Sequence, residues 1–212
     1  MNHLSVLLER YPALLAVREP LSTACDLLEV CFRTGGKLLL CGNGGSACDC
    51  EHIAGELMKS FVLPRRLDDA GAEALAACGD DGTLANGLQS GLPCLVLNGL
   101  PGLSSAFAND AEPALTFAQQ AWVYARPGDV LLGITTSGNS RNVVLAAQAA
   151  KARGAKVIGL TGAKLGRLAP LCDALINVPD TESYRVQELH LPVYHAICLE
   201  LEERFFGKEQ NA

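Results

Sequence analysis

Five short apolar segments restrict how this chain can fold more than any other feature of its sequence. They read LLLCG, CLVLNG, DVLLGITT, KVIGLTG and ALINVP, at residues 38–42, 94–99, 129–136, 156–162 and 174–179. Near-continuous apolar runs of this length, bounded by turn residues, are typical of parallel strands that are buried on both faces. The segments that carry a helical spacing of apolar residues are 46–61, 103–125 and 140–153. This alternation predicts a doubly wound α/β sandwich with right-handed crossovers.

Two parts of the chain lie outside this alternation. Residues 2–33 have apolar faces at helical spacing and predict two helices, with a break near Arg18, Glu19 and Pro20. Residues 64–92 are rich in Gly, Ala and Asp and fit the pattern poorly, although residues 72–77 are compatible with a short helix. The length of 212 residues is that of one large domain, so we interpret residues 1–212 as a single domain with an atypical insertion at 64–92.

The composition argues against several classes of protein. Apolar residues make up 49% of the chain and charged residues 19%, which is more apolar than a disordered chain and leaves apolar surface for contacts between subunits. The net charge is −6 and Lys and Arg do not cluster, which argues against a nucleic-acid-binding surface. Because the sequence has neither a basic and apolar leader nor an apolar run of about 18 residues, we expect no membrane association and a cytoplasmic location.

The nine cysteines are scattered through apolar segments, as is typical of reduced thiols in the cytosol. Cys48 and Cys50 form a C-x-C pair, but no second pair of cysteines lies at ligand spacing. The pattern therefore favours a structural role over a thiolate metal site.

A glycine-rich turn follows the first predicted strand. Asn43, Gly44 and Gly45 lead into a helix whose Ser46 and Asp49 have the spacing of a capping box. Main-chain N–H groups at such a turn can approach an anion or a sugar without interference from side chains. A glycine-rich turn between a strand and a helix is also often only a tight turn, and this one lacks the Gly-Lys-Ser/Thr of a nucleotide-binding P-loop.

The third clear strand ends in a loop that is rich in hydroxyl groups and again enters a helix. Its hydroxyl residues are Thr135, Thr136, Ser137 and Ser140. Hydroxyls and main-chain N–H groups at a helix N-terminus can bind a phosphate without a lysine, which suits an acidic chain. An ordinary polar loop with a Ser N-cap explains the same residues. Two such loops favour a ligand site, because open α/β sheets bind ligands at the carboxyl ends of their strands.

Two pairs of side chains could bind a divalent metal ion. His52 and Glu56 are four residues apart on the helix after the glycine-rich turn, so they share one face. Gln187 and His195 are eight residues apart on the predicted last helix and project to roughly the same side, although Pro192 should kink the helix between them. Imidazole, carboxylate and amide oxygen suit zinc or a similar ion. Surface histidines, or histidines satisfied in the core, explain the same spacing.

Five segments of the chain resemble the bacterial phosphoheptose isomerase family of the SIS, or sugar isomerase, superfamily. They are GNGGSACDCEHIAGEL, AND, GDVLLGITTSGNSRNV, KVIGLTG and VQELHLPVYH, at residues 42–57, 108–110, 128–143, 156–162 and 186–195. The resemblance implies a three-layer α/β sandwich with a five-stranded parallel sheet flanked by helices. It also implies that the N-terminal helices pack in a homotetramer and that the active sites lie between subunits.

The resemblance further implies an activity and the residues that carry it. The expected reaction is the aldose–ketose isomerisation of sedoheptulose 7-phosphate to D-glycero-D-manno-heptose 7-phosphate through an enediol. Glu56 and His195 would transfer the protons. One Zn²⁺ per subunit would be bound by His52, Glu56, Gln187 and His195. The phosphorylated sugar would contact Asn43, Gly44, Gly45, Glu56, Asn109, Asp110, Thr135, Thr136, Ser137, Ser140 and Gln187.

Both an enzyme and a binding protein are compatible with this superfamily. Its non-catalytic members, which bind sugar phosphates or the bacterial replication initiator protein, lack part of the metal-binding set, whereas Glu56 and His195 are present here and favour an enzyme. The chain departs from the family at Ser60, where an arginine is usual, and at Tyr184, where an acidic residue is usual. Residues 64–92 are also longer than the usual connection. These departures leave the identity of the sugar phosphate open.

Overall fold

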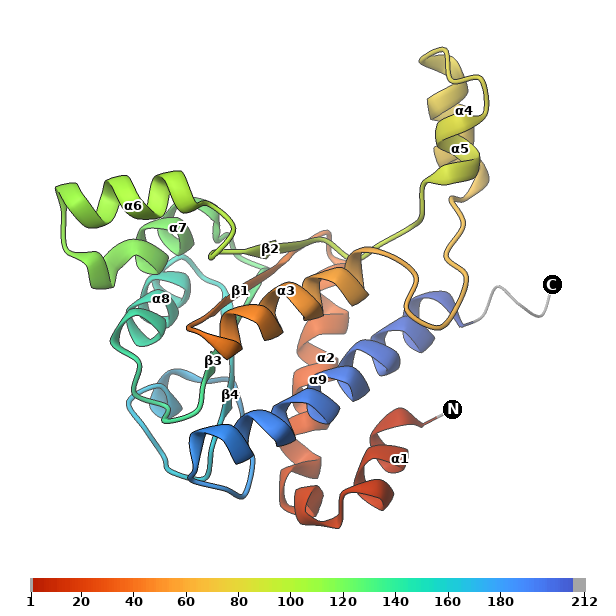
Figure 1. Cartoon of the computed structure of the whole chain (residues 1–212). Helices are drawn as coiled ribbons and strands as arrows, with labels where there is room; N and C mark the ends of the chain where they lie inside the picture. The colour runs from red at the N-terminus through yellow and green to blue at the C-terminus, as the bar shows by residue number, and fades with distance from the viewer. Residues whose placement is uncertain (1, 208–212) are drawn as a thin grey trace.

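A computed structural model of the chain describes residues 2–207, which form a five-stranded parallel sheet between two layers of helices (Figure 1). The strands are β1 (Leu38–Gly42), β2 (Cys94–Val96), β3 (Val130–Thr135), β4 (Lys156–Thr161) and β5 (Ala174–Asn177). Their order in the sheet is β2-β1-β3-β4-β5, and Leu40 of β1 pairs with Val96 on one side and Leu132 on the other. The predicted five-stranded parallel sheet is confirmed. β1 has the expected bounds, whereas β2, β3, β4 and β5 are each shorter than the segment predicted for them, β2 by three residues.

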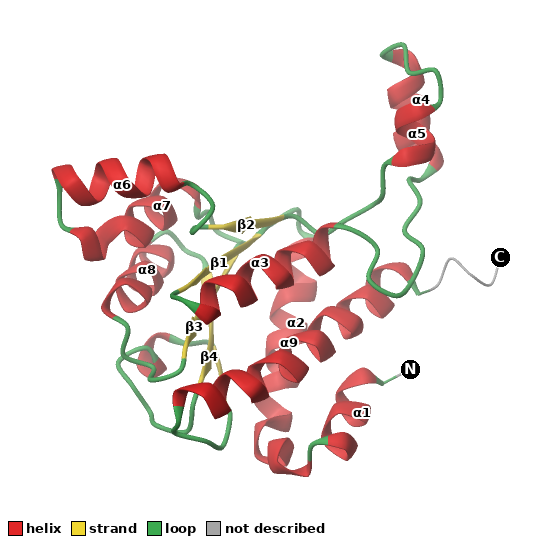
Figure 2. Cartoon of the chain, in the orientation of Figure 1, coloured by secondary structure: helices red, strands yellow, loops and turns green. Residues whose placement is uncertain are grey.

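The two faces of the sheet bury alternate residues of each strand against different helices (Figure 2). Leu38 and Leu40 face the layer that contains α2 (Arg18–Arg33), α3 (Gly45–Met58) and α9 (Ser183–Phe206). Leu39 and Cys41 face the layer that contains α7 (Thr116–Tyr124) and α8 (Arg141–Ala152). Because both faces are covered, the strands are apolar at successive positions, which is the pattern that predicts them.

The N-terminal helices divide at a different place from the one expected. The chain forms α1 (His3–Arg10), a 3-10 helix (Pro12–Val17) and then α2, which begins at Arg18. The predicted break near Arg18, Glu19 and Pro20 is therefore wrong. Pro20 lies in the first turn of α2, where a main-chain N–H has no partner within the helix and proline is tolerated. The break follows Tyr11 instead, where Pro12 opens the 3-10 helix.

The expected helical segment 103–125 is also divided. It forms α6 (Pro101–Asp110), a short 3-10 helix (Pro113–Leu115) and α7. Pro113 lacks an N–H and disfavours the helical conformation of the residue before it, and Glu112 is accordingly extended. α9, in contrast, continues as a helix through Pro192, and a further 3-10 turn (Ala169–Leu171) precedes β5.

Within residues 64–92, the helices α4 (Asp69–Ala77) and α5 (Thr83–Gly87) form an arm that stands away from the body of the molecule (Figure 1). α4 includes the short helix expected at 72–77. The residues of both helices are half-buried or exposed. The two stems of the arm meet at an antiparallel bridge between Arg66 and Gln89.

A buried ion pair fixes α9 against the C-terminal end of α3. The side chains of Arg65 and Glu202 are 0% and 1% exposed, and Arg65 Nε donates to Glu202 Oε1 at 2.8 Å. The guanidinium also donates to the main-chain oxygens of Leu57 and Glu56, at 2.7 and 3.0 Å. Burial alone would raise the pKa of Glu202, but the N–H groups of residues 61–63 and the Arg65 guanidinium outweigh burial and lower it. Every charged group of this pair is thus matched by hydrogen bonds, as a buried charge requires.

His190, on α9, is fully buried, with a relative exposure of 0%. Neither ring nitrogen has a hydrogen-bond partner among the described residues. Burial lowers the pKa of His190 to about 4. The nearby main chain of Thr161 favours the protonated ring, but it offsets only part of this shift. The folded protein therefore holds this imidazole neutral at a pH where the unfolded chain would protonate it.

Loss of one partner of the Arg65–Glu202 pair should destabilise the fold strongly. We expect Arg65→Met to lower the free energy of unfolding by about 3–5 kcal/mol, because it leaves the Glu202 carboxylate buried without its cation. The measurement is urea-induced unfolding. Arg141→Met is the matched control, since it removes an exposed pair with Glu112 and should change stability little. Equal effects of the two substitutions would contradict the role given to the buried pair.

His190 should make the protein sensitive to acid. Because its folded-state pKa lies below the unfolded value near 6.5, the unfolded chain binds the extra proton between about pH 6.5 and 4, and stability falls as the pH is lowered through that range. The full loss is up to about 3 kcal/mol. His190→Leu should remove this part of the pH dependence when unfolding is followed at pH 7 and pH 4.5. The same slope in wild type and variant would show that His190 does not cause it.

Candidate active site

The candidate site lies at the carboxyl ends of β1 and β3, the two strands between which the order of the sheet reverses. The turn after β1 places Gly44 at the N-cap of α3, with a φ of 56° that favours glycine. The capping box predicted for Ser46 and Asp49 is wrong: within the described residues no side chain caps α3. Ser46 is buried, and Asp49 instead accepts a hydrogen bond from the Tyr194 hydroxyl on α9.

A small cavity lies between the two predicted ligand loops, at the carboxyl ends of β1 and β3. Its volume is about 140 Å³, and it is lined by Asn43, Ser46, Ile134, Thr135, Thr136, Ser140 and Gln187. Gln187 reaches over the start of α3, since a Cβ added at Gly45 would lie 2.8 Å from Gln187 Nε2. Hydroxyl and amide groups thus surround a space suited to a small anion such as a phosphate.

The hydroxyl loop is organised by its own hydrogen bonds. Thr135 Oγ1 and Ser140 Oγ lie 2.8 Å apart, and Thr136 Oγ1 lies 3.3 Å from Ser183 Oγ at the start of α9. Ser137 lies on the exposed side of the loop, where its hydroxyl accepts from the N–H of Asn139. Thr135, Thr136 and Ser140 are therefore brought to the cavity, whereas Ser137 stands beside it.

Two asparagine side chains tie the glycine-rich turn to the hydroxyl loop. Asn43 Nδ2 donates to Asn142 Oδ1 at 3.0 Å, and Asn142 Nδ2 donates back to Asn43 Oδ1 at 2.8 Å. The sequence analysis did not single out Asn142, because its partner is 99 residues away in the chain. The amide pair sets the spacing between the loops that follow β1 and β3.

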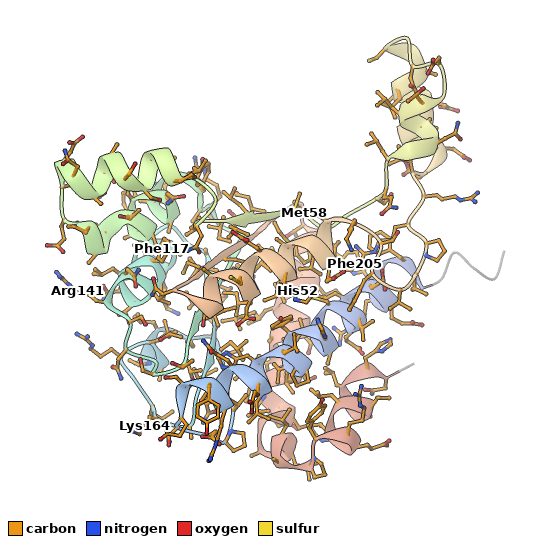
Figure 3. The ribbon with its side chains drawn as sticks, in the orientation of Figure 1. His52, Met58, Phe117, Arg141, Lys164 and Phe205 are labelled. Carbon is orange, nitrogen blue, oxygen red and sulfur yellow. The ribbon has the colours of Figure 1, made fainter. Side chains whose placement is uncertain are left out.

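His52, Glu56 and His195 meet between α3 and α9, where Figure 3 labels His52. His52 Nε2 lies 3.4 Å from His195 Nε2 and 3.3 Å from Glu56 Oε1. Partial burial and the neighbouring His52 lower the pKa of His195, while the Glu56 carboxylate opposes that shift. Lys59 Nζ binds the other carboxylate oxygen of Glu56 at 3.0 Å. Residues from opposite ends of the chain thus form one acid–base cluster.

The fit of a metal ion to this cluster can be judged from the distances. A tetrahedral zinc ion bound at about 2.0–2.2 Å keeps its ligand atoms roughly 3.3–3.6 Å apart, and the two separations around His52 Nε2 fall in this range. As they stand, the described residues contain no group of three or more His, Cys, Asp or Glu side chains that could hold a metal ion. The donor types and the two spacings around His52 fit zinc, with Glu56 Oε1 already turned to the cluster, and the amide of Gln187 would be needed to complete the set.

Other predicted residues lie away from this cluster. Asn109 and Asp110 are exposed at the end of α6, where Asn109 Nδ2 donates to Asp110 Oδ1, and they are not among the residues that line the cavity. Ser60 belongs to the base of the arm, where its N–H donates to Gln89 and its hydroxyl accepts from the Arg65 N–H. Tyr184 is 57% exposed.

The structure also adds features that the sequence analysis missed. A second cavity of about 330 Å³ lies between α1 and α9, and its lining includes His3, Tyr11, Phe61 and His195.

Within the described part of the chain, no helix combines the length and apolarity that crossing a membrane requires. All nine cysteines are free, and Cys48 is exposed whereas Cys50 is buried, so the two do not face one site.

Comparison with known proteins connects this geometry to a family. Residues 70–162 match the model of the SIS domain. The chain is 38% identical over 177 residues to a phosphoheptose isomerase from Crocosphaera subtropica, covering 84% of this chain and 78% of the relative. It is 40% identical over 169 residues to one from Nitratiruptor, covering 80% and 78%.

A solved structure of this family agrees in fold as well as in sequence. The phosphoheptose isomerase from Neisseria gonorrhoeae superposes with a TM-score of 0.70 at 34% identity, covering 87% of each chain. The parallel sheet and the helices that flank it therefore belong to a shared architecture, and the chain belongs to the phosphoheptose isomerase family of sugar-phosphate isomerases, built on the SIS domain.

Proposed function

We propose that this enzyme interconverts sedoheptulose 7-phosphate and D-glycero-D-manno-heptose 7-phosphate through an enediol. The observation that carries the proposal is the meeting of Glu56 and His195 around His52, on the two helices that also border the hydroxyl-lined cavity. Relatives named phosphoheptose isomerase support the choice of a seven-carbon sugar phosphate.

The reaction needs two proton movements that this pair of side chains can provide. A base removes the proton from the carbon next to the carbonyl and returns a proton to the former carbonyl carbon. A second group moves a proton between the oxygens on these two carbons. A carboxylate and an imidazole suit these tasks near neutral pH, and we assign the carbon proton to Glu56 and the oxygen proton to His195. Burial and His52 favour the neutral form of His195, which keeps it able to accept a proton.

Zinc is part of the proposal, with His52, Glu56, Gln187 and His195 as its ligands. Because a group cannot bind the ion and accept a proton with the same lone pair, substrate binding would have to loosen Glu56 or His195 from the ion. When bound, the ion would polarise the substrate oxygens and so acidify the adjacent C–H. Lys59 holds one carboxylate oxygen of Glu56 through an ion pair of 3.0 Å, while the other oxygen lies 3.3 Å from His52 Nε2 and faces the cluster.

The phosphate is proposed to bind in the cavity between the two loops. Thr135, Thr136 and Ser140 offer hydroxyl groups there, and Asn43, Gly44 and Gly45 form the opposite turn. These donors are neutral, so the site can hold an anion in a chain of net charge −6 without a cationic side chain. Ser137, Asn109 and Asp110 remain proposed contacts, which substrate-induced movement of their loops would have to bring closer.

A homotetramer with active sites between subunits is the proposed assembly, and a cytoplasmic location the proposed setting. Large apolar side chains on the N-terminal helices remain exposed in the single chain, among them Leu15 at 54% and Val30 at 63%. The cavity beside His195 opens between α1 and α9. Contacts between subunits at these helices would bury this apolar surface next to the site.

The isomerase proposal is tested by turnover of sedoheptulose 7-phosphate by the purified protein, before chelation, after chelation and with zinc restored. We expect turnover that chelation abolishes and zinc restores. Glu56→Gln and His195→Asn should each lower kcat by about 10²–10⁴-fold with the fold intact. Glu51→Gln, an exposed change on the same helix, is the control and should keep wild-type rates. Near-normal turnover by either site variant would refute the assigned roles, and inactivity of the zinc-loaded wild type would refute this substrate.

The phosphate position is tested by steady-state kinetics of loop variants. Thr136→Ala and Ser140→Ala should each raise KM by about 10–100-fold and lower kcat much less, because a hydrogen bond to a charged ligand is lost in the ground state and the transition state alike. Ser105→Ala, on α6, removes an exposed hydroxyl far from the cavity and should leave both constants unchanged. An unchanged KM in both loop variants would place the phosphate elsewhere.

A further inference from the structure

Two side chains that the proposed reaction does not use are connected to His52. The Tyr194 hydroxyl lies 3.0 Å from His52 Nδ1 and donates to Asp49 Oδ1 at 3.3 Å. Asp49 precedes His52 by one turn of α3, while Tyr194 comes from α9. The tyrosine is 2% exposed, so water does not compete freely for its hydroxyl.

The direction of these hydrogen bonds follows from the number of protons available. A carboxylate only accepts hydrogen bonds, and a tyrosine hydroxyl has a single proton. Burial raises the pKa of Tyr194, so its hydroxyl keeps that proton. Burial raises the pKa of Asp49, and the Tyr194 hydroxyl and His52 oppose only part of this shift. Asp49 Oδ1 is the acceptor of the hydrogen bond from the Tyr194 hydroxyl. Once the proton of Tyr194 points to Asp49, its oxygen can only accept from His52.

The consequence for His52 is a defined tautomer. If Nδ1 carries the proton and donates to Tyr194, then the neutral ring has a free lone pair on Nε2. That nitrogen faces Glu56 Oε1 at 3.3 Å and His195 Nε2 at 3.4 Å. A free lone pair is what a metal ligand needs, and in the free chain it can accept a hydrogen bond from His195 Nε2.

We propose that Tyr194 and Asp49 are positioning residues that hold His52 in the Nδ1–H tautomer, so that Nε2 points unprotonated into the cluster with Glu56 and His195. The inference deepens the proposed function, on whose metal site it rests, but the tautomer exists in the metal-free chain and is measurable without turnover.

Two substitutions separate this role from mere packing. Tyr194→Phe keeps the ring and removes the acceptor for the Nδ1 proton. Asp49→Asn is nearly isosteric, but its amide can donate to the Tyr194 oxygen, which frees the hydroxyl proton to point to His52 Nδ1. Both changes should move the proton of His52 to Nε2, and the second does so with Tyr194 still in place. Tyr124→Phe, on α7 in the opposite layer, is the matched control.

The experiment uses the full chain, treated with chelator and labelled with ¹⁵N-histidine, and reads the tautomers from long-range ¹H–¹⁵N spectra. The chain has only four histidines, His3, His52, His190 and His195, so His52→Gln assigns the signal. We expect Nδ1–H in wild type and in Tyr124→Phe, and Nε2–H in Tyr194→Phe and Asp49→Asn. The Kd for Zn²⁺ should rise by about 10–100-fold in the two site variants only.

The outcomes are distinguishable from those of the isomerase test. Nε2–H in the wild type, or Nδ1–H retained in both site variants, would overturn the inference. A Zn²⁺ affinity unchanged in both variants would overturn it as well, since the tautomer would then not serve the metal. The expected tautomers and affinities in a protein that does not turn over sedoheptulose 7-phosphate would support the inference while the proposed substrate fails.

Discussion

The relative position of α3 and α9 is the constraint on which the site depends, and the buried Arg65–Glu202 pair sets it. Glu56 and His52 lie on one helix and His195 on the other, so a small shift between the helices would separate the cluster. Arg65 binds the main-chain oxygen of Glu56 and the carboxylate of Glu202 together. The same guanidinium thus satisfies the open carbonyls at the end of α3 and joins that end to α9.

The sheet contributes the other half of the site through its topology. After β1 the chain forms β2 on one side of it and later returns to form β3 on the other side. The loops that follow β1 and β3 therefore leave the same end of the sheet in opposite directions. The Asn43–Asn142 amide pair then fixes how far apart they stand. An acidic protein can bind an anion here because dipoles of fixed groups, and not net charge, supply the attraction.

Sequence reasoning predicted well what depends on local pattern. The strands follow from apolar segments of five to eight residues, and the turns from β1 into α3 and from β3 into α8 follow from the Gly and hydroxyl residues after those strands. It failed where context decides between two local options: the break was placed near Pro20, which lies in the first turn of α2, and Ser46 was expected to cap α3, whose N-cap is Gly44.

The partners of the site residues could not be predicted, because they meet only in the folded chain. Tyr194 reaches His52 across 142 positions, and Glu202 reaches Arg65 across 137. One signal was available for Glu202, which follows the buried Leu201 in the last helix. The family resemblance, not spacing, linked His52 and Glu56 to Gln187 and His195.

The arm is anchored beside the candidate site and extends away from it. Its stems are held together by the Arg66–Gln89 bridge and by Ser90, whose N–H and hydroxyl donate to the main-chain oxygens of Arg65 and Arg66. Since both stems are fixed beside α3, the residues between them can extend outward without moving β2 or the end of α3. Arg65 belongs at once to the first stem and to the contact with Glu56, so the arm begins at the point that also positions the proposed base.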